Sequence, residues 1–284
     1  MQIQKSFGQK HATLFLVSTP IGNLSDMTTR AVETLKSVKL IASEDTRVTK
    51  KLCNHFEIAT PLTSYHEHNK HQKTNMLLER LAVGDDIALV SDAGMPLISD
   101  PGDQLVASAL AAGCAVVPIP GANAALTALI ASGLSPQPFL FHGFLERQKS
   151  KKKAELQALK DLSATLIFYE SPHRLKETLT LMQDVLGNRQ VVVARELTKM
   201  YEEFLRGSVA EILAYLTEMK GEVVLLVEGN QFELVKEAWW EGLSVHEHVA
   251  HYISEGLKTN AAIKQTASDL GLVRQDVYKA YHNE

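Results

Sequence analysis

Short apolar segments alternate with longer amphipathic segments from residue 13 to about residue 120. The short segments are rich in Val, Ile, Leu and Phe, and the longer ones repeat apolar residues at helical spacing. This alternation is typical of a parallel sheet whose strands are joined by crossover helices. Asp26 is a candidate N-cap of the first of these helices, which carries Ala31 and Leu35. We expect strands over residues 13–18, 39–43, 61–65, 87–91 and 114–119.

The pattern changes near Pro136, where the segment SPQPF interrupts it. The apolar segments beyond this point are more closely spaced. Residues 191–196 and 203–207 follow one another so directly that they predict an antiparallel hairpin, and with it a mixed sheet. We expect strands over residues 139–143, 166–170, 191–196, 203–207 and 222–228, and helices over 150–162, 173–186 and 208–219.

After Gly229 the pattern is wholly helical, and two short amphipathic segments flank the sequence DLGL. This is the layout of a helix-turn-helix. Trp239 and Trp240 are expected to pack this tail rather than to stack on nucleic-acid bases. The sequence therefore predicts an α/β protein in three parts: an N-terminal, mainly parallel α/β domain over 1–133, a mixed α/β domain over 134–230 and a small helical tail over 231–284.

Composition narrows the class of protein. The 284 residues are 45% hydrophobic and 22% charged, with a net charge of −4, so charge alone would not hold this chain on nucleic acid. Arg147 and the basic run 149–153 could meet phosphates, although such runs are more often the solvated start of a helix. Cys53 and Cys114 form no CxxC pair, which favours a reducing cytoplasm. No segment suggests export or membrane insertion.

Three loops rich in Gly, Pro and other small residues follow predicted strands: STPIGNLSD at 18–26, SDAGMPLISDPG at 91–102 and PIPGANAA at 118–125. Ligands of open α/β sheets bind outside the carboxyl ends of the strands. Small residues let the backbone approach a ligand closely, which suits a flat adenine and a zwitterionic amino acid. One such loop alone is usually a tight turn, whereas three together favour a site. The motifs GxGxxG and GxxxxGK[ST] do not occur, so the usual nicotinamide and nucleoside triphosphate sites have no support.

These loops belong to a longer set of ordered blocks between residues 13 and 230. The set continues with SEDTR at 43–47, FYESPHR at 168–174, ELTKMYEE at 196–203 and GEVVLLVEG at 221–229. Together the blocks resemble the ribosomal RNA small-subunit methyltransferase I family, whose tetrapyrrole-methylase relatives lack SEDTR, YESPHR and LTKxxEE in combination. Two blocks depart from the family pattern: PGANA stands where PGPSA is usual, and GFLER where GFLP is usual.

The resemblance implies a homodimeric, two-domain methylase with S-adenosylmethionine between the domains. The first domain would carry the cofactor loops and the second would complete the cleft. The implied reaction is 2′-O-methylation of a decoding-region cytidine in 16S rRNA, within the 30S subunit, and it needs no metal. The expected cofactor-binding residues are Pro20, Gly22, Asp92, Ala93, Gly94, Ile98, Gly121, Asn123, Ala124, Tyr169 and Glu228.

Methyl transfer from a sulfonium is an in-line displacement, so the enzyme must align donor and acceptor. A ribose hydroxyl also needs a nearby group to take its proton. We expect Glu170 or Lys199 to accept it, and Arg47 and Arg174 to bind phosphates through their planar guanidinium groups. Glu44 is a further candidate. Each of these residues could instead form a salt bridge or cap a helix.

Three other interpretations stay open. His66, His68 and His71 could converge on a metal, although a polar surface loop is the more common outcome. A tetrapyrrole or another small molecule could be the methyl acceptor, because a fold alone does not fix the acceptor. The helix-turn-helix-like tail could belong to a nucleic-acid-binding regulator, but it carries only scattered basic residues.

Overall fold

The computed structural model describes residue 4 and residues 12–217, 219–231, 239–240 and 242–282. Contacts divide the chain into two compact units, Met1–Gln231 and Phe232–Glu284. Each unit is built around its own apolar core. No helix of the described residues combines the length and apolar character needed to cross a membrane.

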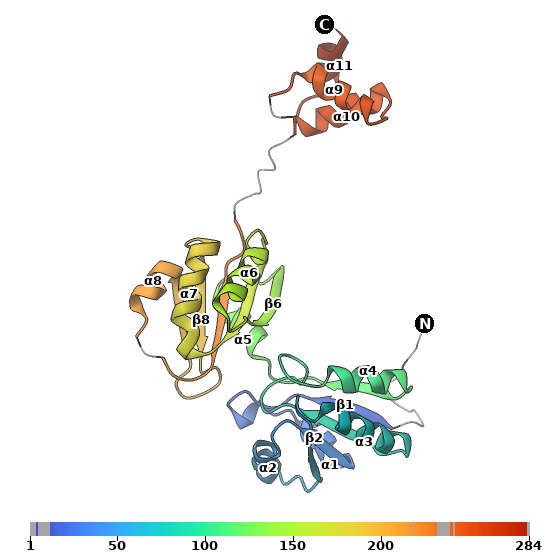
Figure 1. The fold of residues 1–284 in the computed structure, drawn as a ribbon, viewed down its shortest axis with the longest axis vertical. Helices are drawn as coiled ribbons and strands as arrows, with labels where there is room; N and C mark the ends of the chain where they lie inside the picture. Colours follow the sequence, from blue (N-terminus) through green and yellow to red (C-terminus); the bar gives the residue numbers. More distant parts are fainter. Residues whose placement is uncertain (1–3, 5–11, 218, 232–238, 241, 283–284) are drawn as a thin grey trace. The chain divides into compact units, whose positions relative to one another are not determined.

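The first unit contains two five-stranded sheets (Figure 1). The first sheet is parallel throughout and has the order β3-β2-β4-β1-β5. Its strands are β1 (Thr13–Val17), β2 (Leu40–Ser43), β3 (Leu62–Ser64), β4 (Ile87–Val90) and β5 (Ala115–Ile119). The helices that follow them are α1 (Thr29–Ser37), α2 (Thr46–His55), α3 (Lys70–Ala82), α4 (Asp103–Ala111) and α5 (Ala124–Ser132).

Strand β1 shows why this sheet needs helices on both faces. Leu14 points into a core with α3 and α4, whereas Val17 points into a core with α1 and α2. Side chains alternate along a strand, so a strand with apolar side chains on both faces must be covered on both sides. Helix α1 begins after Thr28, whose Oγ1 accepts a hydrogen bond from Ala31 N at 3.1 Å. The expected cap at Asp26 is therefore wrong, because that residue lies in a preceding 3₁₀ turn.

The second sheet is mixed, as the pattern predicted, and has the order β6-β7-β10-β8-β9. Only the β6 and β7 pair is parallel, and β8 and β9 form the expected antiparallel hairpin. Its strands are β6 (Phe139–Phe144), β7 (Thr165–Glu170), β8 (Gln190–Arg195), β9 (Glu203–Ser208) and β10 (Val223–Val227), and its helices are α6 (Lys149–Leu159), α7 (Pro172–Leu186) and α8 (Val209–Tyr215).

Helix α5 connects the two sheets. Ala125, Ala128 and Leu129 pack against the face of the second sheet that carries Ile167 and Leu226. The opposite face packs on α6, α7 and α8. The last helix of the N-terminal segment is thus part of the second sheet's core, while the expected division at residue 133 stays a prediction.

The second unit is helical in its described residues, with α9 (Val245–Ser254), α10 (Thr259–Asp269) and α11 (Arg274–His282) around Val249, Ile263 and Val277. The ring of Trp239 lies 3.8 Å from that of His251, and Trp240 stacks on His248 at 5.1 Å. Both tryptophans therefore pack against helix α9, as expected.

Candidate active site

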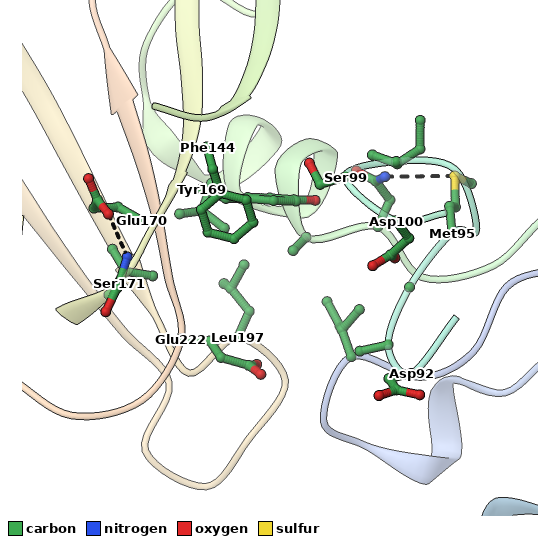
Figure 2. A pocket seen from close by; sticks show the side chains of 18 of the residues that line it. Asp92, Met95, Ser99, Asp100, Phe144, Tyr169, Glu170, Ser171, Leu197 and Glu222 are labelled. Atoms are coloured by element: carbon green, nitrogen blue, oxygen red, sulfur yellow. Dashed lines mark hydrogen bonds between the residues drawn. The ribbon is translucent and has the colours of Figure 1, made fainter. Parts of the chain in front are cut away.

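A cavity of about 420 Å³ opens beside the loops that follow β1, β4 and β5. Its other wall comes from the end of β7, the start of β10 and the loop after β8. Figure 2 shows Asp92, Met95 and Asp100 on one side and Glu170 and Ser171 on the other. The lining residues are Ile21, Asp92, Ala93, Gly94, Met95, Ile98, Ser99, Asp100, Asn123, Ala124, Phe144, Tyr169, Glu170, Ser171, Pro172, Leu197, Gly221, Glu222, Val223 and Val224.

The loop after β4 is fixed to the loop after β1 by backbone hydrogen bonds. Thr19 N donates to Gly94 O at 2.9 Å, and Gly94 N donates to Thr19 O at 3.0 Å. Gly94 has a φ of +81°, and Leu97 and Ser99 also have positive φ values of 73° and 65°. Residues other than glycine rarely adopt a positive φ unless the surrounding structure stabilises it. The loop therefore presents a defined backbone surface to the cavity.

Carboxyl groups gather on this side of the cavity. Asp92 Oδ1 accepts a hydrogen bond from Asp45 N at 3.0 Å. Burial, with the charges of Glu44 and Asp92, raises the pKa of Asp100 to about 7, although a hydrogen bond with Ser91 partly opposes the rise. Burial and the charge of Asp92 also raise the pKa of Glu44. Carboxylates so close to one another favour a cation or a proton between them.

The opposite wall is aromatic and apolar. The ring of Tyr169 lies edge-on to Phe141 at 5.0 Å and to Phe144 at 5.6 Å. Burial raises the pKa of the Tyr169 hydroxyl, so this group stays protonated as a hydrogen-bond donor. Leu197 and Val224 complete an apolar surface. This combination of flat apolar walls and few polar groups is typical of small-molecule sites.

Asn123 begins helix α5 at the edge of the cavity. Its Oδ1 accepts a hydrogen bond from Leu126 N at 2.9 Å, which makes it the N-cap. Its Nδ2 lies 3.7 Å from Met95 Sδ as a donor. Asn123, one of the residues that depart from the family pattern, thus both caps the helix and contacts the neighbouring loop.

A second cavity, of about 870 Å³, adjoins the first because Phe144 and Ser171 line both. Arg174 lies in its wall and donates through Nη2 to the carbonyl oxygens of Leu145 at 2.8 Å and Glu146 at 3.1 Å. Its full lining is Phe144, Leu145, Glu146, Arg147, Glu155, Ser171, His173 and Arg174.

The two expected proton acceptors have other partners in this structure. The side chain of Glu170 is 1% exposed, and its oxygens accept hydrogen bonds from Ser171 N and Thr178 Oγ1. Lys199 Nζ lies 2.8 Å from Glu196 Oε1 and 3.0 Å from Glu222 Oε2. Burial lowers the pKa of Lys199, but these two carboxylates outweigh burial and leave the pKa raised. The ammonium form is therefore favoured at neutral pH.

The structure separates the remaining expected residues into two groups. Eight line the first cavity: Asp92, Ala93, Gly94, Ile98, Asn123, Ala124, Tyr169 and Glu170. Arg174 lines the second cavity. Outside both linings lie Pro20, Gly22, Glu44, Arg47, Gly121, Lys199 and Glu228.

Several residues outside the linings have roles that the structure shows. Gly121 packs against Ser18, whose Cβ lies 2.7 Å from the position of a β-carbon at Gly121. The guanidinium of Arg47 pairs with Asp45 at 2.6 Å while its side chain is 87% exposed. The backbone N of Glu228 donates to Gln190 O, which extends the β10 and β8 pair.

Sequence reasoning missed Asp100, Met95 and Glu222 among the lining residues. Asp100 lies in the quoted block SDAGMPLISDPG, so its carboxyl could have been found beside Asp92. Glu222 immediately precedes β10, and only the antiparallel pairing of Val223 with Glu170 brings it to this cavity. Within the described residues, no group of three or more His, Cys, Asp or Glu side chains is arranged to hold a metal ion.

Comparisons with known proteins agree with this architecture. The profile of the family described as Tetrapyrrole (Corrin/Porphyrin) Methylases matches residues 13–213. The solved structure of a diphthine synthase aligns with a TM-score of 0.61 at 13% sequence identity, covering 78% of this chain and 92% of that chain. At that identity the likeness shows the fold alone.

Two curated relatives are similar over their full length. The chain is 57% identical over 285 residues to "Ribosomal RNA small subunit methyltransferase I" of Bacillus subtilis, with 98% of each chain covered. It is 56% identical over 289 residues to the protein of the same name in Halalkalibacterium halodurans, with 100% of each chain covered. The protein therefore belongs to the ribosomal RNA small subunit methyltransferase I family, a methyltransferase family with the tetrapyrrole-methylase fold, as the blocks of its sequence predicted.

Proposed function

We propose that the protein transfers a methyl group from S-adenosylmethionine to the ribose 2′-oxygen of a decoding-region cytidine in 16S rRNA. The substrate is the 30S subunit, and the enzyme acts as a homodimer in the cytoplasm. The observation that carries this proposal is the cavity beside the loops after β1, β4 and β5, which combines an acidic side with an aromatic wall. The relatives named as rRNA methyltransferases support the acceptor.

The residues of the first cavity fit the donor. A volume of about 420 Å³ lies within the range of small-molecule sites, about 300–1,000 Å³. The aromatic wall with Phe144 and Tyr169 suits a flat adenine. Asp92 and Asp100 suit the positive charges of an ammonium and a sulfonium. When bound, the donor supplies a methyl group attached to a positively charged sulfur.

The change in the charge on sulfur during the reaction explains why one side of the first cavity carries carboxylates. The ribose oxygen forms a bond to the methyl carbon, the carbon–sulfur bond breaks, and its electron pair returns to sulfur. The sulfur is cationic before the step and neutral after it. Carboxylates beside it therefore hold the substrate more strongly than the product, which aids product release.

Asp100 is the group that we assign to accept the ribose proton. It lines the cavity, and its pKa of about 7 suits a base that must be ionised yet hold a proton at neutral pH. Glu170 and Lys199 are less suitable, because the first is hydrogen-bonded in the interior and the second is held as an ammonium by two carboxylates.

The experiment that tests this function offers three acceptors with S-adenosylmethionine labelled on its methyl group. Naked 16S rRNA, assembled 30S subunits and a tetrapyrrole are incubated separately with the protein. We expect label in the RNA of the 30S subunit, at a cytidine whose 3′ phosphodiester resists alkaline cleavage because its 2′-oxygen is blocked. Label on the tetrapyrrole alone, or on a base rather than a ribose, would overturn the proposal.

A further inference from the structure

A chain of buried polar side chains lies beneath the first turns of α7. The side chain of Lys152, on α6, is 1% exposed, and its Nζ donates to Thr178 Oγ1 at 3.0 Å. Thr178 Oγ1 in turn donates to Glu170 Oε2 at 2.5 Å. Lys152 Nζ also lies 3.6 Å from Glu177 Oε1. A buried ammonium and a buried carboxylate are thus joined through one hydroxyl, in a region where unpaired charges are costly.

The other oxygen of Glu170 faces the start of α7. Oε1 accepts a hydrogen bond from Ser171 N at 2.8 Å and lies 3.4 Å from Arg174 Nε. Nη2 of the same guanidinium donates to the carbonyl oxygens of Leu145 and Glu146. Arg174 is therefore held by a carboxylate and by two backbone carbonyls, and its orientation depends on where the carboxylate of Glu170 is fixed.

Arg174 and Ser171 lie where the two cavities meet. Ser171 lines both cavities, and Arg174 lines the second together with Arg147 and His173. In the part of the chain that the structure describes, Arg147 and His173 have no ion pair, and both are exposed. The second cavity therefore presents the guanidinium groups of Arg147 and Arg174 beside the proposed methyl-transfer site.

The same wall holds two carboxylates, those of Glu146 and Glu155, which balance the charges of its two arginines. Glu155 Oε2 accepts a hydrogen bond from Glu146 N at 3.0 Å and lies 3.8 Å from His142 Nε2. Helix α6, which begins two residues after Arg147, adds three exposed lysine side chains to this region, those of Lys149, Lys151 and Lys153. Lys152, between them, points inward to Thr178. A polyanionic strand fits this surface better than a neutral or cationic ligand does.

We propose that the buried Lys152, Thr178 and Glu170 chain is a positioning device for the RNA strand: it fixes Arg174 at the junction of the two cavities, where the guanidinium binds a phosphodiester next to the methylated ribose. This inference rests on the proposed function. It makes Glu170 a positioning residue.

A stabilising role alone does not account for the buried, hydrogen-bonded side chains of Lys152, Thr178 and Glu170. Buried ion pairs contribute little net stability compared with apolar residues of similar volume. They do hold groups in a defined geometry, and a binding site needs that geometry fixed by a supporting layer of hydrogen bonds. The hydrogen bonds of Lys152, Thr178 and Glu170 connect α6, α7 and β7 to the guanidinium of Arg174. This is the kind of supporting layer that a binding site requires.

The test uses Thr178→Val in the full-length protein, with Thr180→Val as the matched control. Thr180 lies on the same helix and is exposed, and among the described residues its hydroxyl donates only to Lys176 O, at 2.8 Å. We expect Thr178→Val to raise the KM for 30S subunits about tenfold, with kcat and the Kd for S-adenosylmethionine changed less than about twofold. Thr178→Ser keeps the hydroxyl and restores the KM, and Thr180→Val leaves it unchanged.

A double-mutant cycle distinguishes positioning from general destabilisation. Arg174→Gln alone should raise the KM for 30S subunits and reduce the salt dependence of binding by about one phosphate contact. In the Arg174→Gln background, Thr178→Val should add almost nothing, because it acts through the missing guanidinium. If Thr178→Val does not fold, Lys152→Met replaces it in the same cycle.

The outcomes separate the two proposals. If the wild-type protein binds the cofactor but methylates no RNA, the proposed function fails. If it methylates 30S subunits, and the folded variants keep the wild-type KM or have additive effects with Arg174→Gln, the positioning role is wrong. An unchanged KM for Arg174→Gln would also overturn it.

Discussion

A β-carbon added at Gly22 would lie only 2.6 Å from Cγ of Lys199. Gly22 belongs to the loop after β1, in the first sheet, and Lys199 to the loop between β8 and β9, in the second. The Lys199 ammonium is fixed by Glu196 and Glu222, so the side chain has little freedom to move aside. The two loops thus meet with no room for a methyl group.

Gly22→Ala should therefore destabilise the protein by more than backbone strain alone. Gly84→Ala is the control. Gly84 also has a positive φ, +99° compared with +150° at Gly22, but no atom lies within 4 Å of a β-carbon added at Gly84. We expect strain of about 1–2 kcal/mol in both variants and a further loss of about 1–3 kcal/mol at Gly22 from overpacking. Urea denaturation measures both free energies of unfolding. Equal losses would mean that the loops have room to separate.

Asp92→Asn should weaken cofactor binding without changing the fold. Asparagine keeps an oxygen that can accept the hydrogen bond from Asp45 N, but it removes the negative charge facing the cavity. We expect the Kd for S-adenosylmethionine to rise about tenfold or more by calorimetry, with an unchanged circular dichroism spectrum. Asp85→Asn, which breaks only the pair with Arg80, is the control. An unaltered Kd for Asp92→Asn would place the cofactor elsewhere.

The rate of methyl transfer should rise with pH through the pKa of Asp100. A proton acceptor must be ionised, so kcat/KM is low below about pH 7 and levels off above it. Asp100→Asn should reduce kcat by about 10²-fold to 10⁴-fold, the usual contribution of a general base, and abolish this limb of the profile. A variant that keeps both the rate and the pH dependence would exclude Asp100 as the base.

The same group should make stability depend on pH in a definite direction. The folded protein raises the pKa of Asp100 from 3.8 to about 7, so it holds this proton more tightly than the unfolded chain does. The contribution of Asp100 to the free energy of unfolding is therefore fully present below about pH 4 and is lost as the pH rises to about 7.

Asp100→Asn should consequently match the wild-type stability near pH 4 and exceed it at pH 8. Urea denaturation at several pH values checks this, because the two proteins differ only in the carboxyl group of Asp100 and in its effect on its neighbours Glu44 and Asp92. A stability difference that stays constant from pH 4 to 8 would show that Asp100 has an ordinary pKa.

Hydrophobic periodicity predicted the fold well because this architecture depends on it directly. Every predicted strand is present, with no end displaced by more than one residue, and β8 and β9 form the expected hairpin. The N-cap of α1 was misplaced because Asp26 and Thr28 are both good caps, and only the preceding 3₁₀ turn decides between them. The packing of α5 on the second sheet has no signal in its own sequence.

The candidate site was less predictable, because it depends on contacts between distant segments. The loops after β4 and β5 were found from their small residues and their position after strands. Glu222 reaches the cavity only through the pairing of β10 with β7. Glu170 in turn accepts a hydrogen bond from Thr178, eight residues further along the chain on α7. A block of sequence identifies which residues belong to a site, but their roles follow from partners elsewhere in the chain.

The cap that Asn123 provides for α5 bears on how this position can vary among related enzymes. Serine and asparagine are equally good at receiving the amide at the start of a helix. An exchange of serine and asparagine at position 123 therefore keeps the cap of α5 while it adds or removes an amide donor beside Met95. Position 123 can thus adjust the wall of a ligand site during evolution at no cost to the scaffold.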